Sequence, residues 1–190
     1  MIFLFLSLQF SSKSSGASKG DEWTNTLYFT SEPENPGSSP TEIKDHNLES
    51  YFDKVEGTGE NIEKVEIFKI KLSLLSSRIP VIAGAWHEFT VVKSENWYWS
   101  FEKNSKGIYV QQGKTAESVK DYCFGEKRTK VNPEGRHSEE EHEGDTIQDI
   151  FIWIYSNDHL NQGYHATKSN CHHFASLVFE AIARQNGRQL

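Results

Sequence analysis

Apolar and polar residues alternate along residues 63–77, a period of two that predicts a β-strand. Val65 and Ile67 stand between Lys and Glu residues, and the apolar positions resume at Ile70. The three-residue step from Ile67 to Ile70 breaks the period. We therefore expect either a bulge or a change of the buried face at that point.

A hairpin is predicted next, because the period of two recurs on both sides of a short polar turn. Its arms are residues 86–93 and 97–103, around Ser94-Glu95-Asn96, and a third strand follows at 108–112. Strands joined by short turns in this way form an antiparallel meander. The hairpin is rich in aromatic residues, namely Trp86, Trp97, Tyr98, Trp99 and Phe101. These side chains either fill the core or leave an exposed patch that binds a partner.

Two segments near the C-terminus have apolar residues spaced by three and four, the pattern of an amphipathic helix. In the first, residues 144–158, the expected N-cap is Asp145, and the apolar positions are Ile147, Ile150, Phe151, Ile154 and Tyr155. In the second, residues 169–185, the expected cap is Ser169 or Asn170, and the apolar positions are Cys171, Phe174, Leu177, Val178, Ala181 and Ile182. Gly187 marks the expected end of the second helix.

Strands followed by helices predict an α+β fold, with the antiparallel meander packed against two or three helices. Residues 1–60 are expected to be a signal-like or disordered tail, because aliphatic residues become scarce after the first ten. The domain is then expected at 61–190. Residues 2–10 resemble a short signal peptide without its positive charge, so both a secreted and a cytoplasmic location stay open. This apolar run is too short to cross a bilayer, which takes about 20 residues.

Composition narrows the partners that the protein can have. The net charge is −7 and no basic stripe is visible, so nucleic acid is not an expected partner. Two cysteines exclude a disulfide framework, although one bridge between Cys123 and Cys171 stays open. Residues 113–144 are polar and are expected to be irregular. No cofactor, metal site or transmembrane segment is expected, and the oligomeric state stays open.

Cys171 is a candidate nucleophile because it falls in the first turn of the second helix, on the side that faces the core. Unpaired backbone N–H groups and the positive end of the helix dipole favour a thiolate there. The alternative is a small buried side chain without chemistry. A thiol nucleophile also needs a base, and His172 and His173 are poorly placed for that role because adjacent helical residues point apart.

His87 is the candidate base. It stands at the head of a predicted strand, on the same face as Phe89 and Val91. A histidine at the end of a core strand, next to a helix N-terminus, has the position that a thiol–imidazole pair needs. The alternative is a core histidine whose ring nitrogens are satisfied by hydrogen bonds.

The pairing expected within the hairpin indicates a third candidate, a residue that orients the base. If paired positions sum to 189 or 190, Glu102 lies opposite His87 and Ser100 lies opposite Phe89. A carboxylate there could accept a hydrogen bond from the imidazole and orient it. A slip of one residue would remove Glu102 from that face. The alternative to an orienting role is a surface glutamate paired with Lys103 or Lys106.

These residues also carry a resemblance. In the stretch YHATKSNCHHFASLVFEAI, Tyr164, Asn170-Cys171 and His173-Phe174 resemble the nucleophile segment of the circularly permuted papain-like, NlpC-type thiol enzymes. That group includes the lecithin retinol acyltransferase-like proteins and the PPPDE peptidases. The resemblance covers about residues 62–186, and the order of His87 before Cys171 is the permuted one.

The resemblance implies a permuted papain-like core in which Cys171 is the nucleophile, His87 the base and His173 structural. A polar residue of the next strand would orient the base. The acyltransferases usually carry a second histidine there, whereas this chain offers Ser100 and Glu102, so the third role is open between them. A counterpart of their membrane-anchoring C-terminal helix is not expected in this sequence.

The leading hypothesis is a cysteine-dependent hydrolase or acyltransferase that acts on an amide, isopeptide or acyl ester or thioester bond. Its substrate would be a protein or peptide, or a lipid acyl group, with a slight preference for the amide. The alternative is a catalytically inactive papain-like binding module that uses the aromatic hairpin.

Overall fold

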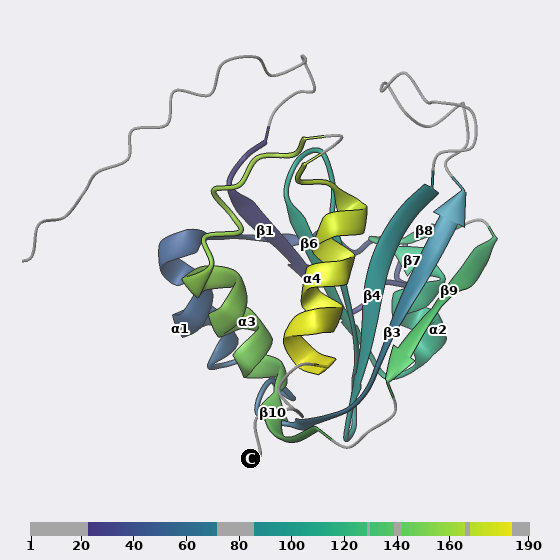
Figure 1. Cartoon of the computed structure of the whole chain (residues 1–190), viewed down its shortest axis with the longest axis horizontal. Helices are drawn as coiled ribbons and strands as arrows, with labels where there is room; N and C mark the ends of the chain where they lie inside the picture. The colour runs from purple at the N-terminus through teal and green to yellow at the C-terminus, as the bar shows by residue number, and fades with distance from the viewer. Residues whose placement is uncertain (1–22, 72–85, 129, 139–141, 166–167, 184–190) are drawn as a thin grey trace, which may run out of the picture.

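The computed structural model describes residues 23–71, 86–128, 130–138, 142–165 and 168–183 (Figure 1). The signal-like residues 2–10 and the helix stop expected at Gly187 lie outside these ranges. The fold is α+β, with a mostly antiparallel mixed sheet and a few helices.

The main sheet has eight strands in the order β10-β3-β4-β5-β6-β1-β2, and β9 also pairs with β3. The strands are β1 (Thr26–Thr30), β2 (Thr41–Lys44), β3 (Asn61–Lys71), β4 (Trp86–Ser94), β5 (Tyr98–Lys103), β6 (Ile108–Gly113), β9 (Val131–Ser138) and β10 (His142–Thr146). The predicted meander is confirmed as β3-β4-β5-β6, in which every neighbouring pair is antiparallel. The β1–β6 pair is parallel and makes the sheet mixed.

Helices cover both faces of this sheet. The helical segments are η1 (Asp45–Asn47), α1 (Leu48–Phe52), α2 (Ala116–Lys120), α3 (Ile147–Ser156) and α4 (Cys171–Ala183). Figure 1 shows α4 lying across the front of the sheet beside α3 and α1, with α2 on the far side. A second, two-stranded sheet of β7 (Tyr122–Cys123) and β8 (Glu126–Lys127) stands near α2.

Two apolar clusters, one on each face, account for these layers. The larger holds Trp99 and Phe101 of β5 together with side chains of α1, α3 and α4. The smaller holds Phe89 and Val91 of β4 and Val119 of α2. Trp99 and Phe101 have no exposed surface, so the aromatic hairpin mainly fills the core, and Trp86 is 36% exposed at its end.

The break in the period of β3 is a change of face. Val65 packs in the larger cluster, whereas Phe68 and Ile70 pack against the smaller one. β3 and β4 pair residue for residue from Lys64 to Lys71, so no bulge interrupts this ladder. On the other side of the strand, the pairing of β3 with β9 shifts register between Glu66 and Phe68, so an irregularity accompanies the change of face. The period breaks because both faces of the strand are covered.

The expected tail at 1–60 was wrong for residues 23–60. β1 extends the sheet by pairing with β6, and Leu27 and Phe29 are core residues. α1 contributes Leu48 and Phe52 to the same core. The region is polar on average, but it contains short apolar segments in β1 and α1. These segments are stable only because they pack on strands that lie far along the chain. The domain therefore begins before residue 61.

The expectation of irregular structure at 113–144 was also wrong. This region contains α2, β7, β8, β9 and β10 within its described parts. β9 pairs with β3 through backbone groups, which do not depend on apolar side chains. Pro133 lies in β9, consistent with the tolerance of proline in edge strands.

Both predicted helices are present, with corrections at their surfaces. Thr146 rather than Asp145 caps α3, through a capping box with Asp149. Tyr155 of α3 and Leu177 of α4 are exposed by 46% and 41%, so neither belongs to the buried stripe that its spacing predicted. α4 begins at Cys171, as expected.

Candidate active site

The first turn of α4 meets β4 where β4 and β5 separate. The pairs of the β4–β5 ladder run from Lys93–Tyr98 to Thr90–Phe101. Beyond Thr90, the backbone N–H of Glu88 donates a hydrogen bond to the sulfur of Cys171. One turn further along α4, the hydroxyl of Thr90 donates to the carbonyl of Ala175 at 3.0 Å and fixes the helix on the strand.

Asn170 caps α4. Its Oδ1 accepts a hydrogen bond from the backbone N–H of His173 at 3.1 Å, the bond that defines an N-cap side chain. The Nδ1 atom of His173 lies 2.9 Å from the same oxygen. The hydroxyl of Ser169, the other expected cap, accepts a hydrogen bond from Lys103 instead. His173 is thus held by the cap and is turned to Asn170.

His87 stands between Cys171 and Glu102. Its Nε2 atom lies 2.7 Å from Oε2 of Glu102. A further side-chain hydrogen bond joins the imidazole to Cys171. Because Nε2 faces the carboxylate, Nδ1 is the nitrogen available to the sulfur. The structure therefore brings together three of the residues that the sequence singled out.

The hairpin register differs from the expected one. Paired residues are Val91–Ser100 and Thr90–Phe101, so Ser100 does not lie opposite Phe89. Extending this register by one step places Glu102 opposite Phe89. The expected pairing of Glu102 with His87 was therefore two residues off, an even shift that leaves Glu102 on the same face of the sheet.

Glu102 is buried, which excludes the alternative of a surface glutamate paired with Lys103 or Lys106. Ser100 is also buried, and its hydroxyl accepts a hydrogen bond from Nε2 of Gln111 at 2.9 Å. Of the two candidates for orienting His87, Glu102 makes the contact with the imidazole.

Arg128 completes the site, although no pattern in the sequence indicated it. Its guanidinium donates to both oxygens of Glu102, from Nη2 to Oε1 at 2.7 Å and from Nη1 to Oε2 at 3.1 Å. The same group lies over the ring of Phe89, 4.3 Å from its centroid. Arg128 follows β8 in a polar region, and no local signal connects it with β5. A buried glutamate needs a cation, but the sequence does not say which one.

The electrostatics of the site favour a thiolate–imidazolium pair. Burial raises the pKa of Cys171, but the hydrogen bond and charge of His87 and the N–H of Glu88 outweigh it and bring the pKa to about 7. Burial lowers the pKa of His87, yet hydrogen bonds to Cys171 and Glu102 raise it to about 9. At neutral pH the imidazole of His87 is therefore protonated, and about half of the Cys171 side chains are thiolates paired with it.

Glu102 stays ionised in this setting. Burial raises the pKa of its carboxyl, but the adjacent Arg128 and His87 hold that pKa well below its usual range. A carboxylate that is fixed by a bidentate guanidinium can only accept hydrogen bonds. Glu102 therefore orients the imidazole and stabilises its positive form.

Cys123 is the other cysteine near the site. Its sulfur donates to Oε1 of Glu102 at 3.3 Å. Burial and the adjacent carboxylate raise the pKa of this thiol, so it remains protonated. Both cysteines are free, and the bridge between Cys123 and Cys171 that the sequence left open is not formed.

Tyr164 adds a hydroxyl next to the nucleophile. Its oxygen lies 4.0 Å from the sulfur of Cys171. Burial and the proximity of Cys171 raise the pKa of this phenol, so it stays protonated and can donate. The side chain comes from the connector between α3 and α4.

The described residues contain no group of three or more His, Cys, Asp and Glu side chains that would suit a metal ion. Within the same ranges, no helix has the length and apolar character needed to cross a membrane. A scan against protein-family models gave no match, and neither did searches of curated proteins and of solved structures. The likeness to permuted papain-like enzymes therefore rests on this chain's own residues.

Proposed function

We propose that this protein is a cysteine-dependent hydrolase or acyltransferase with a permuted papain-like core. One observation carries the proposal. The thiol of Cys171, the imidazole of His87 and the carboxylate of Glu102 form a continuous hydrogen-bonded chain at a helix N-terminus. A nucleophile, a base and an orienting group are the parts that covalent acyl transfer needs.

The reaction would begin with attack of the Cys171 thiolate on a carbonyl carbon, which forms a carbon–sulfur bond. The tetrahedral intermediate collapses when the bond to the leaving nitrogen, oxygen or sulfur breaks, and the imidazolium of His87 gives that atom its proton. A thioester on Cys171 remains. Water, or an acceptor nucleophile in the transferase case, then gives a proton to His87, attacks the thioester and releases the thiolate.

The negative charge on the carbonyl oxygen needs hydrogen-bond donors. The backbone N–H of Cys171 lies at the start of α4, where helix N–H groups have no intrahelical partner. It donates to the hydroxyl oxygen of Tyr164, and the carbonyl oxygen of a substrate would take the place of that acceptor. The hydroxyl of Tyr164, protonated and near the sulfur, is the second donor that we assign. Two donors aimed at the developing charge form an oxyanion hole.

The binding-module alternative has less support. It needs an exposed aromatic surface on the hairpin, whereas Trp99 and Phe101 are in the core and Trp97 and Tyr98 are half-buried. Trp86 alone among the five aromatic side chains reaches 36% exposure. An inactive module also gives no reason for a buried imidazole between a thiol and a carboxylate.

Acylation by an activated ester tests the proposal. On incubation with p-nitrophenyl acetate, we expect one acetyl group to appear on Cys171 by intact mass and peptide mapping. The Cys123→Ala variant should acylate as the unaltered chain does, and the Cys171→Ala variant should not. Acylation at Cys123, or at Cys171 with a rate that a His87→Ala substitution leaves unchanged, would contradict the proposal.

A further inference from the structure

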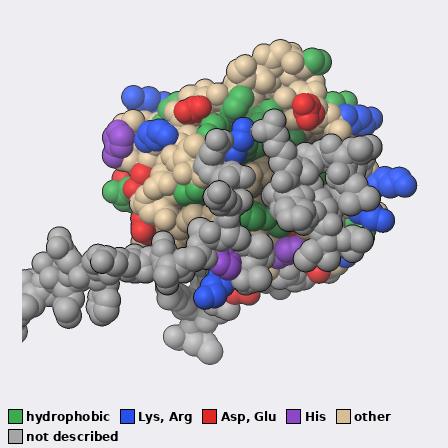
Figure 2. Space-filling view, turned by 90° about the horizontal axis from the view of Figure 1, so that it is seen from above, with side chains coloured by type: hydrophobic (Ala, Val, Ile, Leu, Met, Phe, Trp, Pro, Cys, Tyr) green, Lys and Arg blue, Asp and Glu red, His purple; other side chains and the backbone are tan. Residues whose placement is uncertain are grey.

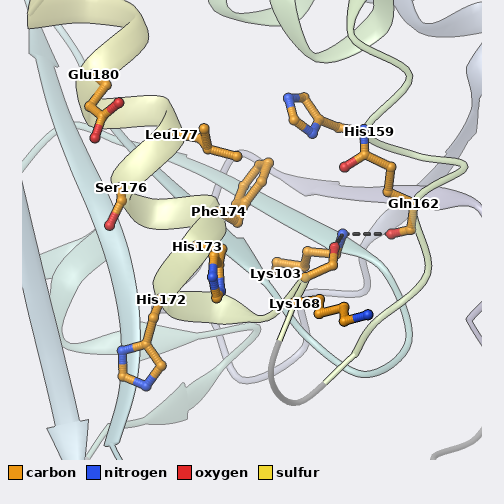
Figure 3. A pocket seen from close by; sticks show the side chains of 11 residues that line it. Lys103, His159, Gln162, Lys168, His172, His173, Phe174, Ser176, Leu177 and Glu180 are labelled. Atoms are coloured by element: carbon orange, nitrogen blue, oxygen red, sulfur yellow. Dashed lines mark hydrogen bonds between the residues drawn. The ribbon is translucent and has the colours of Figure 1, made fainter. Parts of the chain in front are cut away.

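A pocket of about 330 Å³ opens beside the first turns of α4. Residues of α4, from His172 to Glu180, form one wall, and the connector that contains His159 and Gln162 forms the other (Figure 3). Lys103, the last residue of β5, lies between them. The volume is at the small end of the range for ligand sites, about 300–1,000 Å³.

Lys103 is a buried cation without an acidic partner. Its side chain extends toward the connector, where the ammonium donates to the carbonyl of Gln162 at 2.5 Å and to the hydroxyl of Ser169 at 2.8 Å. It also lies 4.6 Å from the centroid of the Trp23 ring. All three partners are neutral, and no carboxylate of the described residues forms an ion pair with it.

This arrangement is costly without a ligand. Burial alone lowers the pKa of Lys103 to about 8, so the side chain is still charged at neutral pH. Buried charges in proteins are usually paired, because removal from water costs several kcal/mol per ion. An anion in the pocket would supply the missing partner.

His159 is a second incompletely satisfied group in the pocket wall. It is 5% exposed, and its Nε2 atom is buried without a hydrogen-bond partner among the described residues. Burial and the charge of Lys103 lower its pKa, which keeps the ring neutral. Figure 3 shows this ring facing α4 across the pocket.

The charge of the lining also favours an anion. It includes two lysines, Lys103 and Lys168, against one acidic residue, Glu180, in a chain whose net charge is −7. Seen from the end where α4 begins, charged and histidine side chains lie mostly around the rim of the molecule, with apolar side chains nearer the centre (Figure 2). The comparison of two lysines with one glutamate makes the lining of the pocket more basic than the chain as a whole.

The pocket is adjacent to the nucleophile. Ser169, which binds the Lys103 ammonium, lies two residues before Cys171, and two residues of chain extend over at most about 7 Å. The pocket is thus lined by Ser169 and His172, which stand on either side of Cys171 in the chain, and a group held at Lys103 would lie within about two residues' length of Cys171. The volume is too small for a long acyl chain.

We propose that this pocket is a subsite for a single carboxylate of a peptide-like substrate, with the ammonium of Lys103 as its counter-charge. The inference deepens the proposed function, on which it rests, by favouring a peptide or isopeptide substrate with a free carboxylate near the scissile carbonyl. One fixed ammonium matches the single charge of a carboxylate. A phosphate dianion would need a second fixed cation, and Lys168 is an exposed residue at the rim.

Binding to the Cys171→Ala variant of the full chain tests the pocket apart from catalysis. By calorimetry or NMR titration, N-acetylglycine should bind at least about tenfold more tightly than its neutral amide, since only the acid can form a charge-assisted hydrogen bond with the ammonium. Lys103→Met in that background should remove the preference. Lys106→Met, which deletes the charge of an exposed lysine in the turn after β5, should keep it.

Equal binding of the acid and the amide would overturn the proposal, as would tighter binding of inorganic phosphate than of N-acetylglycine. If Lys103→Met does not fold, Ser169→Ala replaces it, because this variant removes one group that positions the ammonium. The preference should then fall several-fold, and an unchanged preference would count against the pocket.

Alkylation of the unaltered chain separates this proposal from the enzymatic one. Bromoacetylglycine should label Cys171 faster than bromoacetylglycine amide. Fast labelling by both reagents at equal rates would leave the thiol enzyme standing and refute the carboxylate subsite. Slow labelling by both, with acid-selective binding to the Cys171→Ala variant, would refute the enzyme and retain the anion site.

Discussion

The Nε2 atom of His87 lies 2.7 Å from Oε2 of Glu102, although the strand register places Glu102 opposite Phe89. The contact is diagonal, between positions two residues out of register on one face of the sheet, a distance that long side chains can cross. Arg128 holds the same carboxylate from the other side. The orientation of the imidazole therefore depends on two contacts of one buried carboxylate, with His87 on β4 and with Arg128 after β8.

The rate of alkylation of Cys171 should be proportional to the fraction of its thiol that is ionised. The pKa of this thiol is lowered to about 7, so the rate with iodoacetamide should rise with pH to half its maximum near pH 7 and level off above pH 8. Cys123, whose pKa is raised, should react slowly over this range. Peptide mapping after timed quenching measures both sites. A midpoint at Cys171 near that of an ordinary thiol, about 8.5, would contradict the ion pair.

His87→Ala should remove most of this reactivity. Without the imidazolium, the pKa of Cys171 returns to or above its ordinary value, and the thiolate fraction at pH 7 falls at least about tenfold. Turnover of a substrate, unlike alkylation, should also decline above pH 9, because His87 must then supply a proton that it has lost. His165→Ala, which removes an exposed histidine from the connector, is the matched control.

Glu102 and Arg128 should be strongly coupled in the free energy of unfolding. Glu102→Gln or Arg128→Met alone leaves one buried charge poorly compensated and should destabilise the protein by about 3–5 kcal/mol. The double variant should be more stable than the sum of the single changes predicts, with a coupling energy of about 0.5–3 kcal/mol. Urea denaturation of the four proteins measures it. Additive effects would show that the pair does not interact.

Ser100→Ala should leave the chemistry of the site nearly unchanged. The hydroxyl accepts a hydrogen bond from Gln111 and does not contact His87, so its loss should alter stability by about 1 kcal/mol. The rate of Cys171 alkylation at pH 7 should stay within about twofold of that of the unaltered chain. A twofold change corresponds to a free energy well below the contribution of one hydrogen bond. A much larger decrease in the alkylation rate would indicate that Ser100 helps to orient His87.

Tyr164→Phe tests the oxyanion hole. Loss of one donor should lower the rate of acylation by p-nitrophenyl acetate by about 10²–10³-fold. Alkylation by iodoacetamide passes through no oxyanion, so its rate should change little. If both rates fall together, Tyr164 instead acts on the thiolate itself.

The capping of α3 makes a prediction about stability alone. Thr146 accepts a hydrogen bond from the backbone N–H of Asp149, so Thr146→Ala should destabilise the protein by about 1 kcal/mol. An Asp149→Ala change should have a similar effect by removing the other half of the capping box. Thermal denaturation at constant pH compares both variants with the unaltered chain. No change in either would refute the assigned cap.

The nucleophile segment was predictable because its signals are local. The spacing of Phe174, Val178 and Ile182 gave the helix, and Asn170 supplied the cap that fixes its start at Cys171. His87 was placed by alternation within one strand. The same reasoning failed for Leu177, which faces the pocket, since spacing gives the side of a helix but not the width of its buried stripe.

The register of the hairpin was less well determined. Its turn was located correctly, but the pairing of Glu102 was two residues off. The even shift preserved the face, so the predicted contact of Glu102 with His87 survived an incorrect register. Arg128 could not be found, because a salt bridge between residues 26 positions apart leaves no periodic trace in a single sequence.

The sequence by itself determined the amphipathic helix that carries Cys171, its cap and the alternating strand that carries His87, because periodicity and capping depend on neighbours within a few residues. The tertiary structure alone decided that Arg128 clamps Glu102, that β1 joins the sheet beside β6, and that Lys103 faces a pocket without an acidic partner. These are contacts between distant segments. Their existence depends on how strands order and helices pack, which local pattern does not specify.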